Sequence, residues 1–157
     1  MNVSKDHLEL LCALNDHEVK YLVVGGYATG IHSEPRATKD LDVYIRADAE
    51  NGVAVFRALA AFGAPLSGLT ASDFVDGKSF FQMGKPPERV DILQVISGVT
   101  FDESWDKRVY AIVNGDLSIP VISAEMLIQN KLAAGREQDL IDVKKIRAAA
   151  EEGPDKN

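Results

Sequence analysis

The stretch that decides the fold is VGGYATGIHSEPRATKDLD, which occupies residues 24–42. It follows an apolar, strand-like run and begins with the glycine pair Gly25 and Gly26. Glycine permits a tight turn in which backbone N–H groups approach an anion closely. The stretch ends with Asp40 and Asp42, which point to the same face of a strand because they are two residues apart. Neighbouring carboxylates repel each other unless a cation lies between them, so the pattern predicts a divalent-metal site beside a phosphate-binding turn.

A third carboxylate, Asp91, lies in the segment RVDILQVI, residues 89–96. Its apolar neighbours predict a central, buried strand, where an aspartate must be hydrogen-bonded, ion-paired or bound to metal. If the strands are adjacent, Asp40, Asp42 and Asp91 form an oxygen-rich site of the kind that Mg²⁺ prefers. Two such ions, about 3.5–4 Å apart, would hold both the attacking and the leaving oxygen of an in-line displacement.

Length and composition bound the class of protein. The chain has 157 residues, 46% hydrophobic and 26% charged, which predicts a single domain over residues 1–150 followed by a disordered tail, 151–157. The net charge of -7 argues against binding duplex DNA through phosphate neutralisation. No signal peptide and no apolar run of about 18 residues is present, so we expect a cytoplasmic protein with no membrane partner.

Hydrophobic periodicity predicts an α+β fold, in which a mixed or antiparallel sheet is flanked by helices and the C-terminal section is helical. Ser4 is the expected cap of the first helix, and His7 within that helix is expected on the surface. The expected helices are 4–17, 27–32, 49–62, 101–108, 123–134 and 136–150, and the expected strands are 20–24, 41–46, 78–83, 89–96, 110–113 and 117–122.

The glycine pair, a spacer of thirteen residues and the Asp-Leu-Asp strand together resemble the signature of the nucleotidyltransferase superfamily, which has the polymerase-beta-like fold. The form RATKDLD, residues 36–42, is similar to that of the AbiEii-type branch and of small bacterial lincosamide nucleotidyltransferases. The string KLAAGREQDLID, residues 131–142, resembles the same branch. The similarity extends over roughly residues 20–147.

This resemblance implies a nucleotidyltransferase fold and transfer of a nucleoside monophosphate from a nucleoside triphosphate, with release of pyrophosphate. Asp40 and Asp42 would bind Mg²⁺, while Asp91 would complete the metal site and help to deprotonate the acceptor hydroxyl. Catalysis would come mainly from positioning and charge neutralisation. Gly25 and Gly26 would hold the nucleotide phosphates.

The remaining expected nucleotide-binding residues are Thr38, Arg89, Lys131, Arg136 and Asp139. Lys131 would contact the triphosphate, and Asp139 would hold Lys131 or Arg136 in place. Arg89 is a departure, because the AbiEii-type branch has lysine there and a guanidinium fork differs from a compact ammonium. Thr38 is open between a phosphate contact and a loop cap. Taken without the resemblance, the acids and Arg136 of the C-terminal string predict solvated helical salt bridges.

The sequence leaves the acceptor open among a protein hydroxyl, a tRNA end and a small hydroxylated molecule. Two other function classes remain. These alternatives to an enzyme are a toxin–antitoxin component that acts through a partner protein and a non-catalytic nucleotide-binding domain. The presence of all three carboxylates favours the enzyme.

Overall fold

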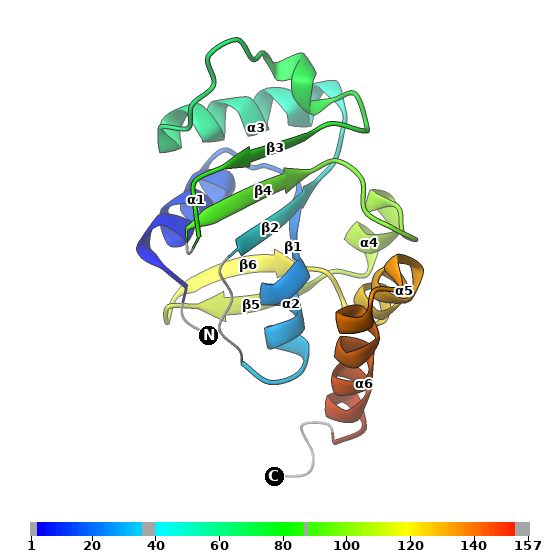
Figure 1. The fold of residues 1–157 in the computed structure, drawn as a ribbon. Coiled ribbons are helices and arrows are strands. Elements are labelled where there is room, and N and C mark those ends of the chain that lie inside the picture. Colours follow the sequence, from blue (N-terminus) through cyan, green and yellow to red (C-terminus); the bar gives the residue numbers. More distant parts are fainter. Residues whose placement is uncertain (1–2, 36–39, 87, 153–157) are drawn as a thin grey trace.

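The computed structural model describes residues 3–35, 40–86 and 88–152. Within them, strands form one mixed sheet with the order β3-β4-β2-β1-β6-β5 (Figure 1). β1 pairs antiparallel with β2 and parallel with β6, β2 runs parallel to β4, and β3–β4 and β5–β6 are antiparallel hairpins. The predicted α+β class and mixed sheet are confirmed. The strands are β1 (Tyr21–Val24), β2 (Asp40–Ile45), β3 (Phe80–Met83), β4 (Arg89–Leu93), β5 (Val109–Val113) and β6 (Leu117–Val121).

The helices begin and end within a few residues of the predicted positions. Ser4 caps the first helix, as predicted, by accepting a hydrogen bond of 3.2 Å from the backbone N–H of His7. The last helix continues to Glu152, two residues into the predicted tail, and residues 153–157 lie outside the described residues. The helices are α1 (Lys5–Asp16), α2 (Gly25–His32), α3 (Ala49–Phe62), the short 3₁₀ helix η1 (Ala71–Phe74), α4 (Phe101–Asp106), α5 (Ala124–Ala134) and α6 (Glu137–Glu152).

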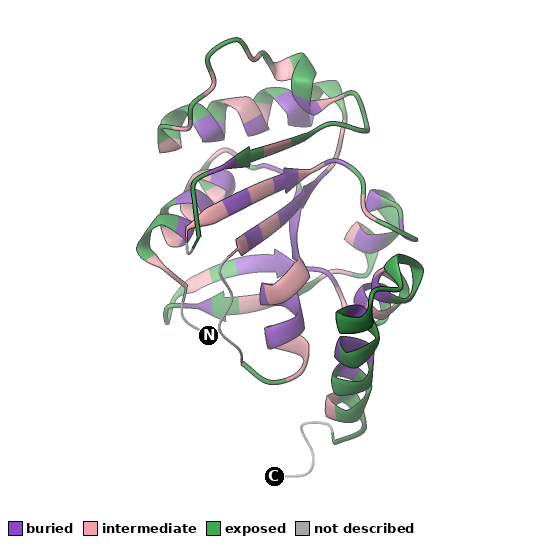
Figure 2. Ribbon diagram, in the orientation of Figure 1, coloured by how far each residue is buried: buried purple, intermediate pink, exposed green. Residues whose placement is uncertain are grey.

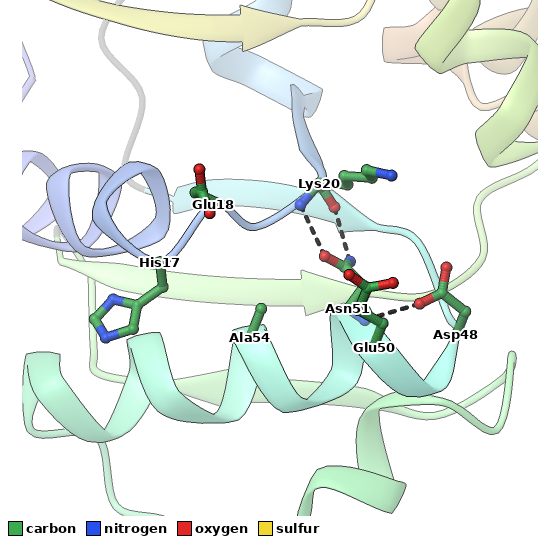
Figure 3. Close-up of a pocket in the computed structure, with 7 residues that line it drawn as sticks. All are labelled: His17, Glu18, Lys20, Asp48, Glu50, Asn51 and Ala54. Atoms are coloured by element: carbon green, nitrogen blue, oxygen red, sulfur yellow. Dashed lines mark hydrogen bonds between the residues drawn. The ribbon is translucent and has the colours of Figure 1, made fainter.

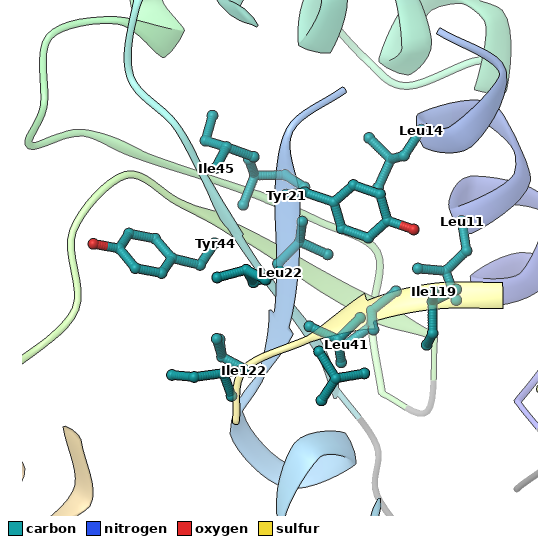
Figure 4. Close-up of a cluster of buried hydrophobic side chains, with 14 of the residues drawn as sticks. Leu11, Leu14, Tyr21, Leu22, Leu41, Tyr44, Ile45, Ile119 and Ile122 are labelled. Carbon is teal, nitrogen blue, oxygen red and sulfur yellow. The ribbon is translucent and has the colours of Figure 1, made fainter. Parts of the chain in front are cut away.

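The two faces of the sheet are covered differently. One face packs against α1 and α3, and the hydroxyl of Tyr21 on this face donates to Asn15 of α1. Figure 4 shows buried side chains on both sides of the strands, with Tyr21 and Leu14 on this side and Tyr44 on the other. On the opposite face, Tyr44 of β2 meets the ring of Phe101 of α4 at 5.2 Å. Over β3 this second face is open, with Phe80 and Gln82 exposed (Figure 2). The open part of this face, over β3, therefore lies one strand away from β2, which carries Asp40 and Asp42.

Asn51, at the start of α3, holds this helix against the ends of the two central strands (Figure 3). Its side chain is 5% exposed, accepts from the backbone N–H of Lys20 at 2.8 Å and donates to the carbonyls of Lys20 and Arg46. These bonds tie α3 to the start of β1 and the end of β2. A small pocket lies beside these hydrogen bonds, and we interpret its lining, which includes Lys20, Asp48 and Asn51, as structural.

Two local expectations were wrong. His7 is buried and not on the surface, because its side chain faces α2. There its Nδ1 forms a hydrogen bond of 2.8 Å with the hydroxyl of Tyr27. β4 ends at Leu93, since the side chain of Gln94 turns to bind the backbone of Gly77 and Asp73. Among the described helices, none combines the length and hydropathy needed to span a bilayer.

Candidate active site

The sheet brings the three predicted carboxylates together. Asp42 on β2 lies opposite Asp91 on the parallel strand β4, and Asp40 lies opposite Arg89. Since paired residues on neighbouring strands project to the same side, all four side chains lie on the partly open face of the sheet. The acids are half-buried, whereas Leu41 and the other residues that alternate with them pack into the core.

Arg89 and Gln82 hold the third acid. Nε and Nη2 of Arg89 lie 3.4 Å from Oδ1 and Oδ2 of Asp91, and Nε lies 4.0 Å from Oδ2 of Asp40. Gln82 on β3 donates to Oδ1 of Asp91 at 2.8 Å. Gln82 was missed at the sequence level, because it is the observed register of the β3–β4 hairpin that places it directly opposite Asp91. Arg89 therefore lies among the acids, on the site face that its predicted role in nucleotide binding requires.

The glycine pair opens α2 directly after β1. Gly25 is the first helical residue, and Val24 before it offers no side-chain cap, so the backbone donors of the first turn face the site without one. Gly25 has φ +66°, and an added Cβ would lie 2.2 Å from Oδ2 of Asp42. Only glycine fits here, because the Asp42 carboxylate packs against the Gly25 backbone. Gly26 follows in the same turn and is half-buried.

Lys131 and its acidic partners form a buried cluster. Nζ of Lys131 lies 3.0 Å from Oδ2 of Asp142 and 3.4 Å from Oδ1 of Asp139, and all three residues are at most 6% exposed. Arg136 binds the other oxygen of Asp139 at 2.7 Å, and Gln138 donates to Asp142 at 2.9 Å. The interpretation of the two acids and Arg136 as solvated helical salt bridges is therefore wrong for Asp139 and Asp142, which are buried. It describes Arg136, whose side chain is largely exposed.

One cleft of about 430 Å³ joins these parts. Asp40, Asp91 and Arg89 lie beside it on the sheet, and the predicted residue Thr38 lies outside the described residues. Asn130, which no sequence motif indicated, ties α5 to the loop after β4 by donating to the carbonyl of Ser97 at 2.9 Å. The cleft is lined by Val24, Gly25, Asp42, Leu93, Ile96, Ser97, Asn130, Lys131, Ala134, Arg136 and Asp139.

The charges of the site shift the ionisation of its residues. Burial, together with the nearby carboxylates of Asp91 and Asp40, raises the pKa of Asp42 to about 7. Burial acts in the same direction on Asp139, but the hydrogen bond and charge of Arg136 outweigh it, so the pKa of Asp139 is lowered. The hydrogen bond to Asp139 raises the pKa of the Arg136 guanidinium in turn. The two walls of the cleft therefore differ: crowded acids on the sheet, and acids neutralised by Lys131 and Arg136 on the helices.

The donor set of the sheet fits a hard divalent cation. Carboxylate oxygens are the ligands that Mg²⁺ takes, and a cation would offset the carboxylate repulsion that, together with burial, raises the pKa of Asp42. In the described parts of the chain, however, no three acidic, histidine or cysteine side chains are arranged as ready ligands for one ion. Arg89 bonds to Asp91 in that region instead.

The fold and site define a nucleotidyltransferase: a glycine turn, an Asp-Leu-Asp strand, a parallel strand with a third acid, and a lysine-bearing helix across one cleft. The chain matches the family described as "nucleotidyltransferase of unknown function" (DUF6036) over residues 2–151 and belongs to it. Nucleoside monophosphate transfer is the reaction that names such a family.

A solved structure shares the fold. The lincosamide antibiotic adenylyltransferase LnuA, in a lincomycin-bound crystal structure, superposes with a TM-score of 0.58 at 17% identity, covering 95% of this chain and 99% of that one. The predicted nucleotidyltransferase fold is therefore confirmed. A comparison with curated proteins gives no match.

Replacing Gly25 with alanine tests the contact between the first turn of α2 and Asp42. G25A should lose about 2–5 kcal/mol of unfolding free energy, from left-handed backbone strain and overpacking. Gly63 is the matched control, because it also has positive φ but an added Cβ meets nothing within 4 Å. G63A should lose only the strain, about 1–2 kcal/mol. Equal losses in chemical denaturation would contradict the contact.

The raised pKa of Asp42 predicts a pH dependence of stability in metal-free protein. Between pH about 4 and about 7 the native state keeps a proton that the unfolded state releases, so stability falls as pH rises through this window and levels off above it. The loss approaches about 1.4 kcal/mol per pH unit at its steepest. D42N lacks the group, so the difference between the two proteins isolates it. A difference independent of pH in urea denaturation would contradict the shift.

Removing the Lys131 charge should take the ammonium from the buried carboxylate of Asp142 and leave Asp139 with Arg136 alone as its cation. K131M should therefore lose about 3–5 kcal/mol of unfolding free energy. The matched control is Lys107, whose ion pair with Glu125 is exposed on both sides, so K107M should change stability by about 1 kcal/mol or less. Similar losses of unfolding free energy for K131M and K107M would contradict a stabilising role for the buried ion pairs of Lys131.

Proposed function

We propose that this protein is a Mg²⁺-dependent enzyme that moves a nucleoside monophosphate from a nucleoside triphosphate to a hydroxyl acceptor and releases pyrophosphate. The observation that carries the proposal is the single cleft onto which Gly25 at the start of α2, Asp42 and the buried Lys131 all open. Backbone donors, acids and a buried cation around one space match the chemistry of a metal-bound polyphosphate.

The phosphates would lie between the start of α2 and α5. The backbone N–H groups of the first turn of α2, at Gly25 and Gly26, carry the positive end of the helix dipole and favour an anion. Lys131 approaches the same cleft from the opposite wall with its ammonium fixed by Asp139 and Asp142. Because the ammonium is held before the ligand arrives, little side-chain entropy would be lost on binding.

Asp40, Asp42 and Asp91 would hold Mg²⁺, predicted as a two-ion site, which would neutralise phosphate charge and align the acceptor and leaving oxygens. The chain's own residues would position the reactants. The acceptor oxygen attacks the α-phosphorus, the bond from that phosphorus to the oxygen bridging to the β-phosphate breaks, and pyrophosphate leaves. The acceptor proton would pass to a carboxylate, for which Asp91 is our candidate because the hydrogen bond from Gln82 orients it.

A small hydroxylated molecule is the acceptor we would test first. The similar fold of LnuA belongs to an antibiotic adenylyltransferase with lincomycin bound, although at 17% identity that specificity belongs to LnuA. The net charge of -7 works against long nucleic acids. Protein and tRNA-end acceptors, and a toxin or antitoxin partner, stay predictions of the sequence, and nothing among the described residues favours one of them.

A thermal-shift panel tests the nucleotide half of the proposal. ATP, GTP, CTP and UTP are each added with Mg²⁺ or with EDTA, and a nucleotide at about a hundred times its Kd should add about 2.7 kcal/mol of stability. We expect a Mg²⁺-dependent shift with at least one nucleotide in the wild type. D40N/D42N should lose that shift while being at least as stable as the wild type without metal, since the like charges are removed.

Transfer is then measured with the nucleotide that binds, labelled at the α-phosphate, against small hydroxylated acceptors, tRNA and protein fractions. Binding without transfer to any acceptor would support the non-catalytic alternative. The absence of a shift with all four nucleotides would contradict the proposed function.

A further inference from the structure

Arg89 lies where a cation is expected among the acids of the sheet. It is directly opposite Asp40 and two residues before Asp91, so its side chain projects to the same face as both. Its guanidinium contacts both oxygens of Asp91 at 3.4 Å, and its Nε is 4.0 Å from Oδ2 of Asp40. The chain therefore supplies its own positive charge to the site.

A metal ion and Arg89 cannot use Asp91 in the same way. Nε of Arg89 contacts Oδ1, Nη2 contacts Oδ2, and Gln82 donates a third hydrogen bond to Oδ1. A divalent ion bound by Asp91 needs a lone pair of one of these oxygens, and it repels a guanidinium a few ångströms away. The guanidinium and a metal ion therefore compete for the same two oxygens of Asp91.

We propose that Arg89 is a resident counter-ion that competes with the metal and is displaced from Asp91 when metal and nucleotide enter together. The side chain of Arg89 is 35% exposed, so it can swing away without opening the core. Once displaced, it remains at the edge of a site filled with phosphate oxygens, and a guanidinium pairs well with these. This second step rests on the proposed function, whereas the competition for Asp91 does not.

Arg89 should affect the affinity for metal alone and the affinity for metal with nucleotide in opposite directions. Arg89 weakens the binding of metal alone, because the ion must displace a guanidinium. It strengthens the binding of metal with nucleotide, because the displaced guanidinium gains phosphate partners. Metal and nucleotide are therefore coupled through one side chain, and each raises the affinity for the other.

The test is the binding of Mn²⁺ alone, without nucleotide, followed from the electron paramagnetic resonance signal of free Mn²⁺. R89Q should bind Mn²⁺ about five- to tenfold more tightly than the wild type, where tenfold equals about 1.4 kcal/mol. R89K keeps the charge and should lie between the two proteins. The matched control is R46Q, because Arg46 is also partly exposed and pairs with Asp102 at 2.9 Å. R46Q should bind Mn²⁺ as the wild type does.

Binding of Mn²⁺ by R89Q that is equal to or weaker than that of the wild type overturns the competition, as does the absence of binding by both. Titration of the preferred nucleotide with Mg²⁺ then tests the second step, for which R89Q should bind more weakly than the wild type. Equal or tighter nucleotide binding by R89Q overturns that step. If the wild type binds no nucleotide at all, the proposed function fails, and the Mn²⁺ comparison still decides whether Arg89 is a counter-ion.

Discussion

The close approach of the Gly25 backbone to the carboxylate of Asp42 is the constraint on which the rest of the site depends. Asp42 lies opposite Val24 in the antiparallel pair β1–β2, so the strand register delivers the acid to the residue just before α2. The first turn of that helix then packs on the acid, with room for glycine alone at position 25. A slip of one residue would turn Asp42 into the core and destroy the cleft.

Two charge clusters lie on the two walls of the cleft. On the sheet, Asp40 and Asp91 share the guanidinium of Arg89, and Asp42 lies opposite Asp91. On the helices, two buried aspartates share Lys131, and Arg136 completes the balance from the surface. Burial and the neighbouring carboxylates raise the pKa of Asp42 on the sheet, whereas Arg136 and Lys131 outweigh burial and lower the pKa of Asp139 on the helices. This difference between the sheet cluster and the helix cluster suits a site that binds cations together with its ligand.

Much of this was accessible from the sequence because local rules dominate it. The glycine pair, the two-residue spacing of the aspartates and the alternation around Asp91 each predict a strand end or a strand face, and their convergence needs only the pairing of β2 with β4. The helix cluster was harder to predict. Spacing along a helix does not show whether Asp139 and Asp142 face water, and the packing of α5 against α6 decides it.

Gln82 and Asn130 escaped prediction for a related reason. Their roles depend on hydrogen bonds across the β3–β4 hairpin and between α5 and the loop after β4, which no single segment encodes. The contacts of Arg89 depend in the same way on register, because the pairing of β2 with β4 places Arg89 opposite Asp40.

The most direct measurement is a crystal structure with a non-hydrolysable nucleoside triphosphate and Mn²⁺, whose anomalous signal locates the ion. We predict phosphates against the first turn of α2 and Lys131, Mn²⁺ bound by Asp40 and Asp42, and Arg89 moved off Asp91. A nucleotide bound outside the cleft lined by Gly25 and Lys131, or Mn²⁺ bound away from these aspartates, would contradict this prediction.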